Sequence, residues 1–214
     1  MDQISSLLEK LNPAQKEAVT TVDGPVLVVA GAGSGKTRVI TYRIPYLLFT
    51  GVAEPENILA LTFTNKAAGE MKARAALLAG NDFRVPLIST FHSFCALLLR
   101  RHITLLGYSR DFQIFDEEDQ LSLLKEAISE MGKESRYGAR DVQHFLKWRK
   151  ARGDNADIFD PNLQAILDLY TKKLAANQAV DFDDLLLLPL RLFREHPDIK
   201  RRYNELYRFL MVDE

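Results

Sequence analysis

The stretch that decides the fold is Ala30-Gly-Ala-Gly-Ser-Gly-Lys-Thr37. It matches the phosphate-binding loop G-x-x-x-x-G-K-[ST], except that Ala30 stands at the first glycine position. Glycines let such a loop adopt positive φ angles, so that several backbone N–H groups point at one polyphosphate. The lysine reaches the outer phosphate oxygens, and the last hydroxyl binds Mg²⁺. The pattern therefore predicts a polyphosphate site with Mg²⁺, held by Ala32, Gly33, Ser34, Gly35, Lys36 and Thr37.

The sequence around this loop alternates between apolar runs and amphipathic segments. Residues 25–30 form a continuous apolar run rich in valine, which predicts a parallel strand buried on both faces, and a helix is expected over residues 36–50. Alternation of this kind is typical of right-handed crossovers in an α/β fold with a parallel sheet. The cycle repeats with strands predicted at 57–63 and 85–89 and helices at 65–79 and 90–106.

After Gly107 the pattern changes to successive amphipathic helices, predicted at about 116–131, 139–152 and 160–176. We expect this part to be a helical insertion, in which Trp148 packs inward. The chain then returns through a helix whose first residues, Asp181 and Asp184, fit an N-cap and a capping box.

Composition narrows the class of protein. The chain has 28 Lys and Arg against 29 Asp and Glu, a net charge of −1, which argues against coating of nucleic acid by bulk charge and leaves room for a local basic track. The single cysteine, Cys95, cannot form an internal disulfide, so a secreted scaffold is not expected. No apolar run approaches the ~20 residues of a membrane span, and no signal peptide is evident. We therefore expect a cytoplasmic protein without a membrane partner.

The last residues, Leu210-Met-Val-Asp-Glu214, carry a second chemical signal. A carboxylate at the carboxyl end of a buried strand in a protein with a phosphate loop usually holds Mg²⁺, directly or through water. Asp213 is thus a predicted metal ligand together with Thr37, and Glu214 is placed to orient an attacking water. Lys36, Asp213 and Glu214 are the predicted catalytic residues, and the pair of acids favours hydrolysis.

Two strand-to-helix junctions, Thr62-Phe-Thr-Asn65 and Ser89-Thr-Phe-His-Ser93, form a third signal. Ligands of open α/β sheets gather outside the carboxyl ends of the strands. An aromatic residue with polar neighbours, such as Phe63, suits stacking on a base, although a core phenylalanine is the alternative. His92 taken alone is more often structural than a contact. Basic residues along the next helix could contact phosphates: Lys66, Lys72 and Arg74.

Together these motifs resemble the N-terminal part of the superfamily 1 DNA helicases of the UvrD/Rep/PcrA type, from residue 12 to the end of the sequence. Residues 11–19 resemble the Q motif and residues 30–37 match motif I. The two junctions match motifs Ia and Ib, and Val212-Asp-Glu matches the beginning of motif II. Five motifs in the family's order are far more specific than any one of them.

The resemblance implies an ATP-dependent DNA helicase that uses ATP and Mg²⁺, moves 3′ to 5′, and serves DNA repair or replication. It implies that Gln15 reads the adenine edge and that Arg38 stacks on adenine. Single-stranded DNA and junctions of single and double strands are the implied partners. The DNA contacts would come from Thr62, Phe63, Asn65, Thr90 and His92.

The implied architecture is a RecA-like phosphate-loop sheet with an inserted all-helical subdomain, truncated at the Walker B strand. Domain 1A would comprise residues 1–107 and 181–214, and the helical 1B insertion residues 108–180. The second RecA-like domain is missing from the sequence, so we expect weak binding of nucleotide and DNA, no useful ATP hydrolysis and no unwinding. An incomplete sheet also predicts self-association through its open edge.

Two other classes of protein stay open at this point. One is a phosphate-loop enzyme that acts on a small molecule, such as a nucleotide kinase, which would have no use for Phe63. The other is a non-catalytic module for DNA binding or assembly that keeps only the first domain of a helicase.

Overall fold

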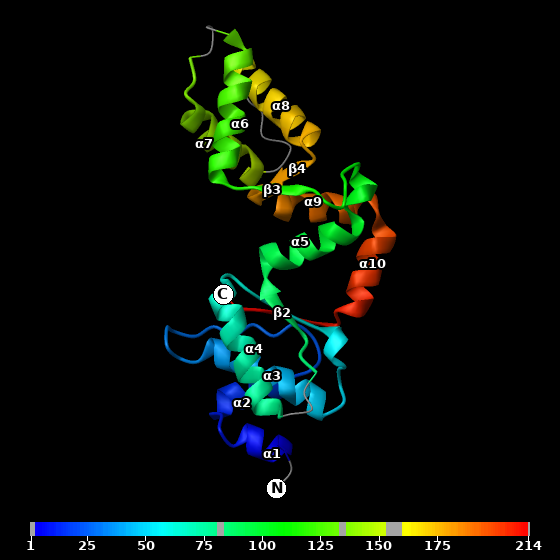
Figure 1. Ribbon diagram of the computed structural model, residues 1–214. Helices are drawn as coiled ribbons and strands as arrows, with labels where there is room; N and C mark the ends of the chain where they lie inside the picture. Colours follow the sequence, from blue (N-terminus) through cyan, green and yellow to red (C-terminus); the bar gives the residue numbers. More distant parts are fainter. Residues whose placement is uncertain (1–2, 81–83, 133–135, 153–159, 214) are drawn as a thin grey trace. The chain divides into compact units, whose positions relative to one another are not determined.

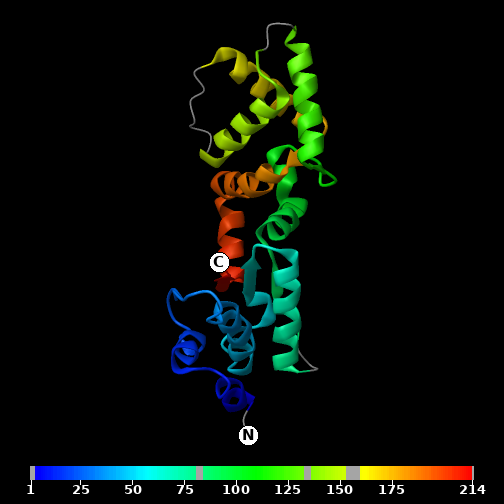
Figure 2. The ribbon, with the colours of Figure 1, turned by 90° about the vertical axis from the view of Figure 1, so that its left-hand side faces the viewer.

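The computed structural model describes residues 3–80, 84–132, 136–152 and 160–213 (Figure 1). The chain divides into two compact units, residues 1–93 with 198–214 and residues 94–197. The first unit holds a three-stranded parallel sheet and the second is mainly helical (Figure 2). The predicted α/β class with a parallel sheet is therefore confirmed. No helix within the described ranges is long and apolar enough to cross a membrane.

The sheet of the first unit has the order β2-β1-β5, with all strands parallel. Its register places Thr62 opposite Thr90 and Leu61 opposite Val212. The central strand is buried at every position, as its uninterrupted apolar sequence predicts for a strand covered on both faces. The strands span Ile58–Thr62 (β1), Leu87–Thr90 (β2) and Phe209–Val212 (β5).

Helices α3 and α4 pack against this sheet and against each other. Ile44 and Leu47 of α3 lie in one apolar cluster with Met71 of α4 and Ile58 of β1, and all four side chains are fully buried. Thr64 caps α4 by accepting a hydrogen bond from the Ala67 N–H at 3.1 Å. The helices of this unit are α1 (Gln3–Leu8), α2 (Pro13–Thr20), α3 (Lys36–Phe49), α4 (Asn65–Ala79) and α10 (Pro197–Leu206), with a 3₁₀ turn at Pro55–Asn57.

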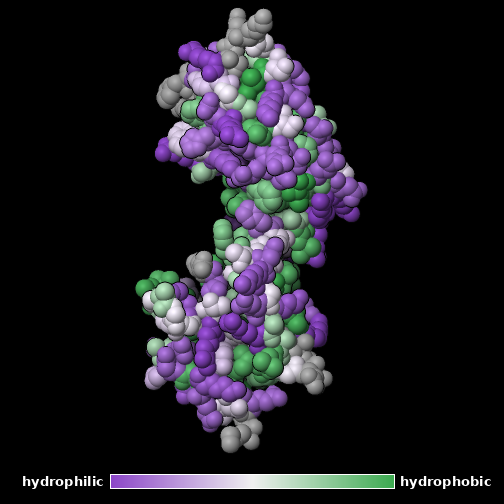
Figure 3. All heavy atoms as spheres, turned by 60° about the vertical axis from the view of Figure 1, so that its left-hand side comes forward, coloured by the Kyte–Doolittle hydropathy of each residue, from purple (hydrophilic) through white to green (hydrophobic). Residues whose placement is uncertain are grey.

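The strand predicted at residues 25–30 is wrong. The segment is neither helix nor strand, and Leu27 and Val29 are 87% and 86% exposed. A valine-rich run becomes a buried strand only where a neighbouring strand accepts its hydrogen bonds. In the described part of the chain the sheet consists of β2, β1 and β5, and residues 25–30 pair with none of these strands. Apolar side chains on the surface are visible as green spheres in Figure 3.

The second unit packs its helices around Leu124, Ile166, Leu167 and Tyr170, which are all fully buried. It also contains a short parallel pair of strands, β3 (Gln113–Phe115) and β4 (Ala179–Asp181), that the helical pattern did not predict. The helices are α5 (Phe91–His102), α6 (Glu117–Glu130), α7 (Ala139–Arg152), α8 (Pro161–Ala176) and α9 (Phe182–Glu195), with a 3₁₀ turn at Ile103–Leu106.

Trp148 does not pack inward as predicted. The buried side chains of α7 are Val142 and Leu146, one helical turn apart, and a residue two positions beyond Leu146 falls on another face. Trp148 is accordingly 40% exposed, and the Arg152 guanidinium carbon lies 4.5 Å from the centroid of its ring. The contact is a cation–π pair at the surface.

A buried ionic network holds the helical unit together. The Asp181 carboxylate, 1% exposed, caps α9 by accepting from the Asp184 N–H, which confirms the predicted capping box. The Lys150 ammonium of α7 donates to both Asp181 oxygens at 2.7 and 2.6 Å and to Asp184 at 2.6 Å. The Tyr170 hydroxyl of α8 and the Gln120 amide of α6 also donate to Asp181. One carboxylate thus joins four helices.

Burial and charge compete in this network. Burial alone would raise the pKa of the Asp181 carboxyl, but the Lys150 charge and the hydrogen bonds outweigh it, so this pKa lies below its ordinary value. Burial and the neighbouring carboxylate raise the pKa of Asp184. Burial alone would lower the pKa of Lys150, and the two carboxylates raise it. Removal of the ammonium would therefore leave buried negative charge without compensation.

We expect Lys150→Met to lower the free energy of unfolding by about 3–5 kcal/mol, because breaking a buried ion pair strands its partner. The matched control is Lys147→Met on the same helix, whose ion pair with Glu117 is largely exposed. The control should cost at most about 1 kcal/mol. Urea unfolding followed by circular dichroism at neutral pH measures both variants, and similar losses in the two would contradict this account.

Candidate nucleotide-binding site

The glycine-rich loop leads directly into the N-terminus of α3. Gly33 and Gly35 have φ angles of 76° and 90°, in the left-handed region that glycine tolerates best. Gly35 is the N-cap residue of α3, and the first turn of that helix carries no acidic side chain. Its N–H groups and positive dipole end are therefore suited to an anion.

The side chains of the loop are held by the loop's own backbone. The Lys36 ammonium donates to the carbonyl oxygens of Ala30 at 2.7 Å and Gly31 at 3.1 Å. The Ser34 hydroxyl donates to the Gly31 carbonyl at 2.6 Å. Lys36 is thus folded over the residues that precede it, where its charge lies beside the exposed glycines. A polyphosphate at the loop would offer the ammonium stronger, charged acceptors than these carbonyls.

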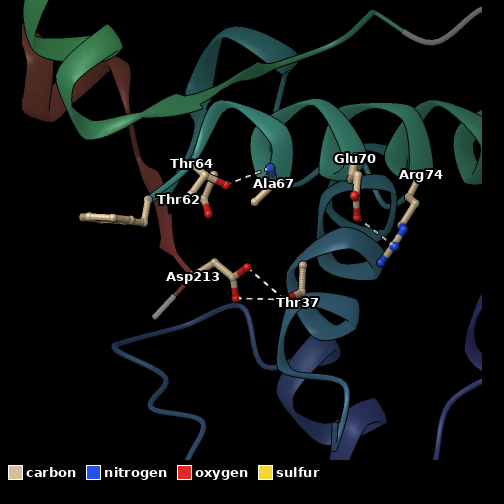
Figure 4. Close-up of a pocket in the computed structure, with 8 residues that line it drawn as sticks. Thr37, Thr62, Thr64, Ala67, Glu70, Arg74 and Asp213 are labelled. Carbon is tan, nitrogen blue, oxygen red and sulfur yellow. Dashed lines mark hydrogen bonds and ion pairs between the residues drawn. The ribbon is translucent and has the colours of Figure 1, made fainter. Parts of the chain in front are cut away.

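Thr37 and Asp213 are 176 positions apart in the sequence and are in contact in the structure. The Thr37 hydroxyl donates to the two Asp213 carboxylate oxygens at distances of 2.9 and 3.2 Å (Figure 4). Asp213 directly follows β5, is 8% exposed, and donates its N–H to the Leu61 carbonyl at 2.9 Å. A hydroxyl and a carboxylate are hard oxygen ligands of the kind that Mg²⁺ prefers, so this donor pair fits the predicted cation.

The carboxyl ends of the three strands bring other predicted residues to the same edge of the sheet. Thr62 ends β1 and Thr90 ends β2, and both are buried. The Thr90 hydroxyl donates to Ser93 at 2.8 Å and accepts from the Ser93 N–H, which fixes the first turn of α5. Asn65 is the first residue of α4, and His92 is half-buried in the first turn of α5.

Phe63 lies just beyond this edge and is 73% exposed. The alternative of a core phenylalanine is therefore excluded. A bare aromatic ring of this size at the mouth of a ligand-binding edge is suited to stacking on another flat ring.

A pocket of about 210 Å³ occupies this edge of the sheet, between the N-terminus of α3 and one face of α4. The sequence predicted Arg74 only as a possible phosphate contact and gave no prediction for Glu70. The signal that could have found them is helical spacing, because residues 64, 67, 70 and 74 fall on one face of α4. The residues that line the pocket include Thr37, Thr62, Thr64, Glu70, Arg74 and Asp213.

Gln15 and Arg38 connect the N-terminal helices to the loop. The Gln15 side chain completes a capping box with Asn12 and donates to the Ser34 carbonyl at 3.1 Å. The Arg38 guanidinium donates to the Lys10 carbonyl at 2.7 Å and to the Tyr42 hydroxyl at 3.3 Å. Both side chains flank the loop, and their roles toward adenine stay predictions. The predicted catalytic Glu214 lies outside the described residues.

Several known proteins have sequences similar to this chain. Residues 11–214 match the family described as UvrD/REP helicase N-terminal domain. The chain is 42% identical over 224 residues to the ATP-dependent DNA helicase PcrA of Bacillus subtilis. The matched region covers 100% of this chain and 30% of that relative. PcrA proteins of Staphylococcus epidermidis and Staphylococcus aureus are 40% and 39% identical over 99% of this chain. The chain spans about 30% of the length of these curated relatives.

The loop geometry disfavours a side chain at Gly35. We expect Gly35→Ala to lower the free energy of unfolding by about 1–2 kcal/mol, because φ is +90° and a Cβ would lie 3.0 Å from the Gln15 amide nitrogen. The control is Gly31→Ala, because Gly31 has no positive φ and a Cβ there would meet no atom within 4 Å. This change should leave the free energy of unfolding unchanged or raise it by up to about 1 kcal/mol. Urea unfolding compares the two, and equal effects would count against the strained loop.

Proposed function

This chain belongs to the UvrD/REP helicase N-terminal domain family, and on that premise we propose that it is the ATP-binding and single-stranded-DNA-binding portion of an ATP-dependent DNA helicase. The observation that carries the proposal is the hydrogen bond between Thr37 and Asp213. It joins the end of the phosphate loop to the carboxyl end of β5, where a phosphate-loop protein needs its two cation ligands.

Different residues of the chain are proposed to bind the phosphates, the cation and the adenine of ATP·Mg²⁺. The N–H groups of residues 32–37 would surround the phosphates, and Lys36 would move from its carbonyl partners to the outer phosphate oxygens. Thr37 and Asp213 would hold Mg²⁺, which when bound neutralises charge on the phosphate oxygens. Gln15 and Arg38 would contact adenine, because they stand beside the loop. Glu214 is proposed to orient the attacking water.

Single-stranded DNA is the proposed second ligand of the same edge. The exposed ring of Phe63 would stack on a base, with Thr62, Asn65, Thr90 and His92 around the strand. Junctions of single and double strands, 3′ to 5′ movement and a role in DNA repair or replication in the cytoplasm belong to the same proposal by resemblance to the family.

By resemblance to the family, residues 1–107 and 181–214 are proposed as domain 1A and residues 108–180 as the 1B insertion; the compact units of the structure divide at other positions, after residues 93 and 197. In the family a second RecA-like domain supplies arginines to the transferring phosphoryl group, a contribution of about 10³–10⁵ in rate when given in trans. Hydrolysis and unwinding are therefore proposed to need that second domain together with the residues of this chain.

Nucleotide binding by the 214-residue chain tests the first half of the proposal. We expect a fluorescent ATP analogue to bind in the presence of Mg²⁺ and Lys36→Ala to weaken binding at least about tenfold, because charge-assisted hydrogen bonds to phosphate are lost. Lys200→Ala, an exposed lysine of α10, is the control and should bind as the unmodified chain does. Equal affinity of both variants would reject the site.

DNA binding tests the second half. We expect Phe63→Ala to weaken the binding of a labelled oligo-dT about 5- to 150-fold, the loss of one stacked base at about 1–3 kcal/mol. The control is Leu77→Ala, another exposed apolar side chain that follows β1, on α4. Fluorescence anisotropy measures both. Unaltered DNA affinity in Phe63→Ala would reject stacking on Phe63, and no DNA binding at all, with nucleotide binding intact, would favour the small-molecule enzyme over the helicase.

A further inference from the structure

The pocket at the sheet edge extends beyond the two proposed cation ligands to the side of α4. Two of its lining residues, Glu70 and Arg74, have no part in the function proposed above. They lie one helical turn apart, and the Arg74 Nη2 is 3.2 Å from the Glu70 Oε2. Figure 4 shows the pair on α4 above the N-terminus of α3, near Thr37.

Stability does not account for this pair. The side chains of Glu70 and Arg74 are 50% and 59% exposed, and an exposed ion pair of this spacing contributes little to folding. Its location is the notable feature, because both side chains line the same pocket as Thr37 and Asp213.

The chemistry of the lining suits a hydrated divalent cation. Two carboxylates and one guanidinium give the lining a net negative charge, and hydroxyls from Thr37, Thr62 and Thr64 add further oxygen atoms. Mg²⁺ gives up its water reluctantly and is bound through few protein ligands, so most of its ligands remain water molecules. Those waters donate hydrogen bonds, and a nearby carboxylate that accepts them strengthens the site.

We propose that Glu70 is a positioning residue of the nucleotide site: its carboxylate accepts hydrogen bonds from water on the cation held by Thr37 and Asp213, and Arg74 orients that carboxylate. This inference rests on the proposed function. It assigns to α4 a direct part in ATP·Mg²⁺ binding, in addition to the DNA contacts proposed for Thr62, Phe63 and Asn65 at and before its first residue.

The test separates the cation-dependent part of nucleotide affinity from the rest. The affinity of the 214-residue chain for mant-ATP is measured with Mg²⁺ and again with EDTA. We expect Glu70→Gln to lower the affinity about tenfold with Mg²⁺ and to leave it unchanged in EDTA, the effect of losing a hydrogen-bond partner of metal-bound water. Glu205→Gln, the same change at an exposed site of α10, is the matched control and should alter neither value.

Variants of the partner residue sharpen the result. Arg74→Gln should lower the same Mg²⁺-dependent affinity by a smaller factor, and Arg74→Lys should restore part of it, because lysine keeps the charge and loses the planar fork. A merely structural role for the pair would lower the affinity equally with Mg²⁺ and in EDTA, and that outcome would overturn the proposal.

The two proposals fail separately. If Lys36→Ala and Thr37→Ala leave mant-ATP binding intact, the nucleotide site itself is wrong. If these two variants weaken binding while Glu70→Gln behaves like its control, the nucleotide site stands and the role of Glu70 is overturned.

Discussion

Parallel pairing of β1 with a strand on each side is the constraint on which the site depends. Because all three strands run in one direction, their carboxyl ends lie at one edge of the sheet. Thr62, Thr90 and Asp213 are therefore placed at that edge by strand pairing, and no contact between their side chains is needed to bring them together. A shift of β5 by one residue would reverse the direction of the Asp213 side chain and separate it from Thr37. The pairing register therefore sets the geometry of the proposed cation ligands more strictly than any single hydrogen bond does.

Patterns of neighbouring residues predicted much of this fold, but they failed for a strand that needs hydrogen-bond partners from elsewhere in the chain. The helix expected at 65–79 begins and ends as predicted, since Thr64 and Gly80 mark its termini. The apolar run at 57–63 became a buried strand, whereas the equally apolar run at 25–30 did not. The difference lies in hydrogen-bond partners, which a strand must find elsewhere in the chain and which its own residues do not specify.

The site shows the same division between local and distant information. The phosphate loop is a contiguous pattern, and Asp213 was found because it follows a strand-like run. Glu70 was missed, because an acid four residues before an arginine on a helix is ordinary surface chemistry until the pocket beside it is known. The network around Asp181 was predicted only as a helix cap, since its partners Lys150, Tyr170 and Gln120 come from other helices.

The position of β5 has a consequence for the order of events during synthesis. Two strands of the sheet are made before residue 94, but the third is made only after the whole helical unit has been synthesised. The helical unit has its own apolar core and can fold while the sheet still lacks its last strand. Asp213 arrives with that strand, so a nascent chain carries a finished phosphate loop for some time before it acquires the carboxylate that completes the pair. The two proposed cation ligands, Thr37 and Asp213, therefore exist together only once residue 213 has been made.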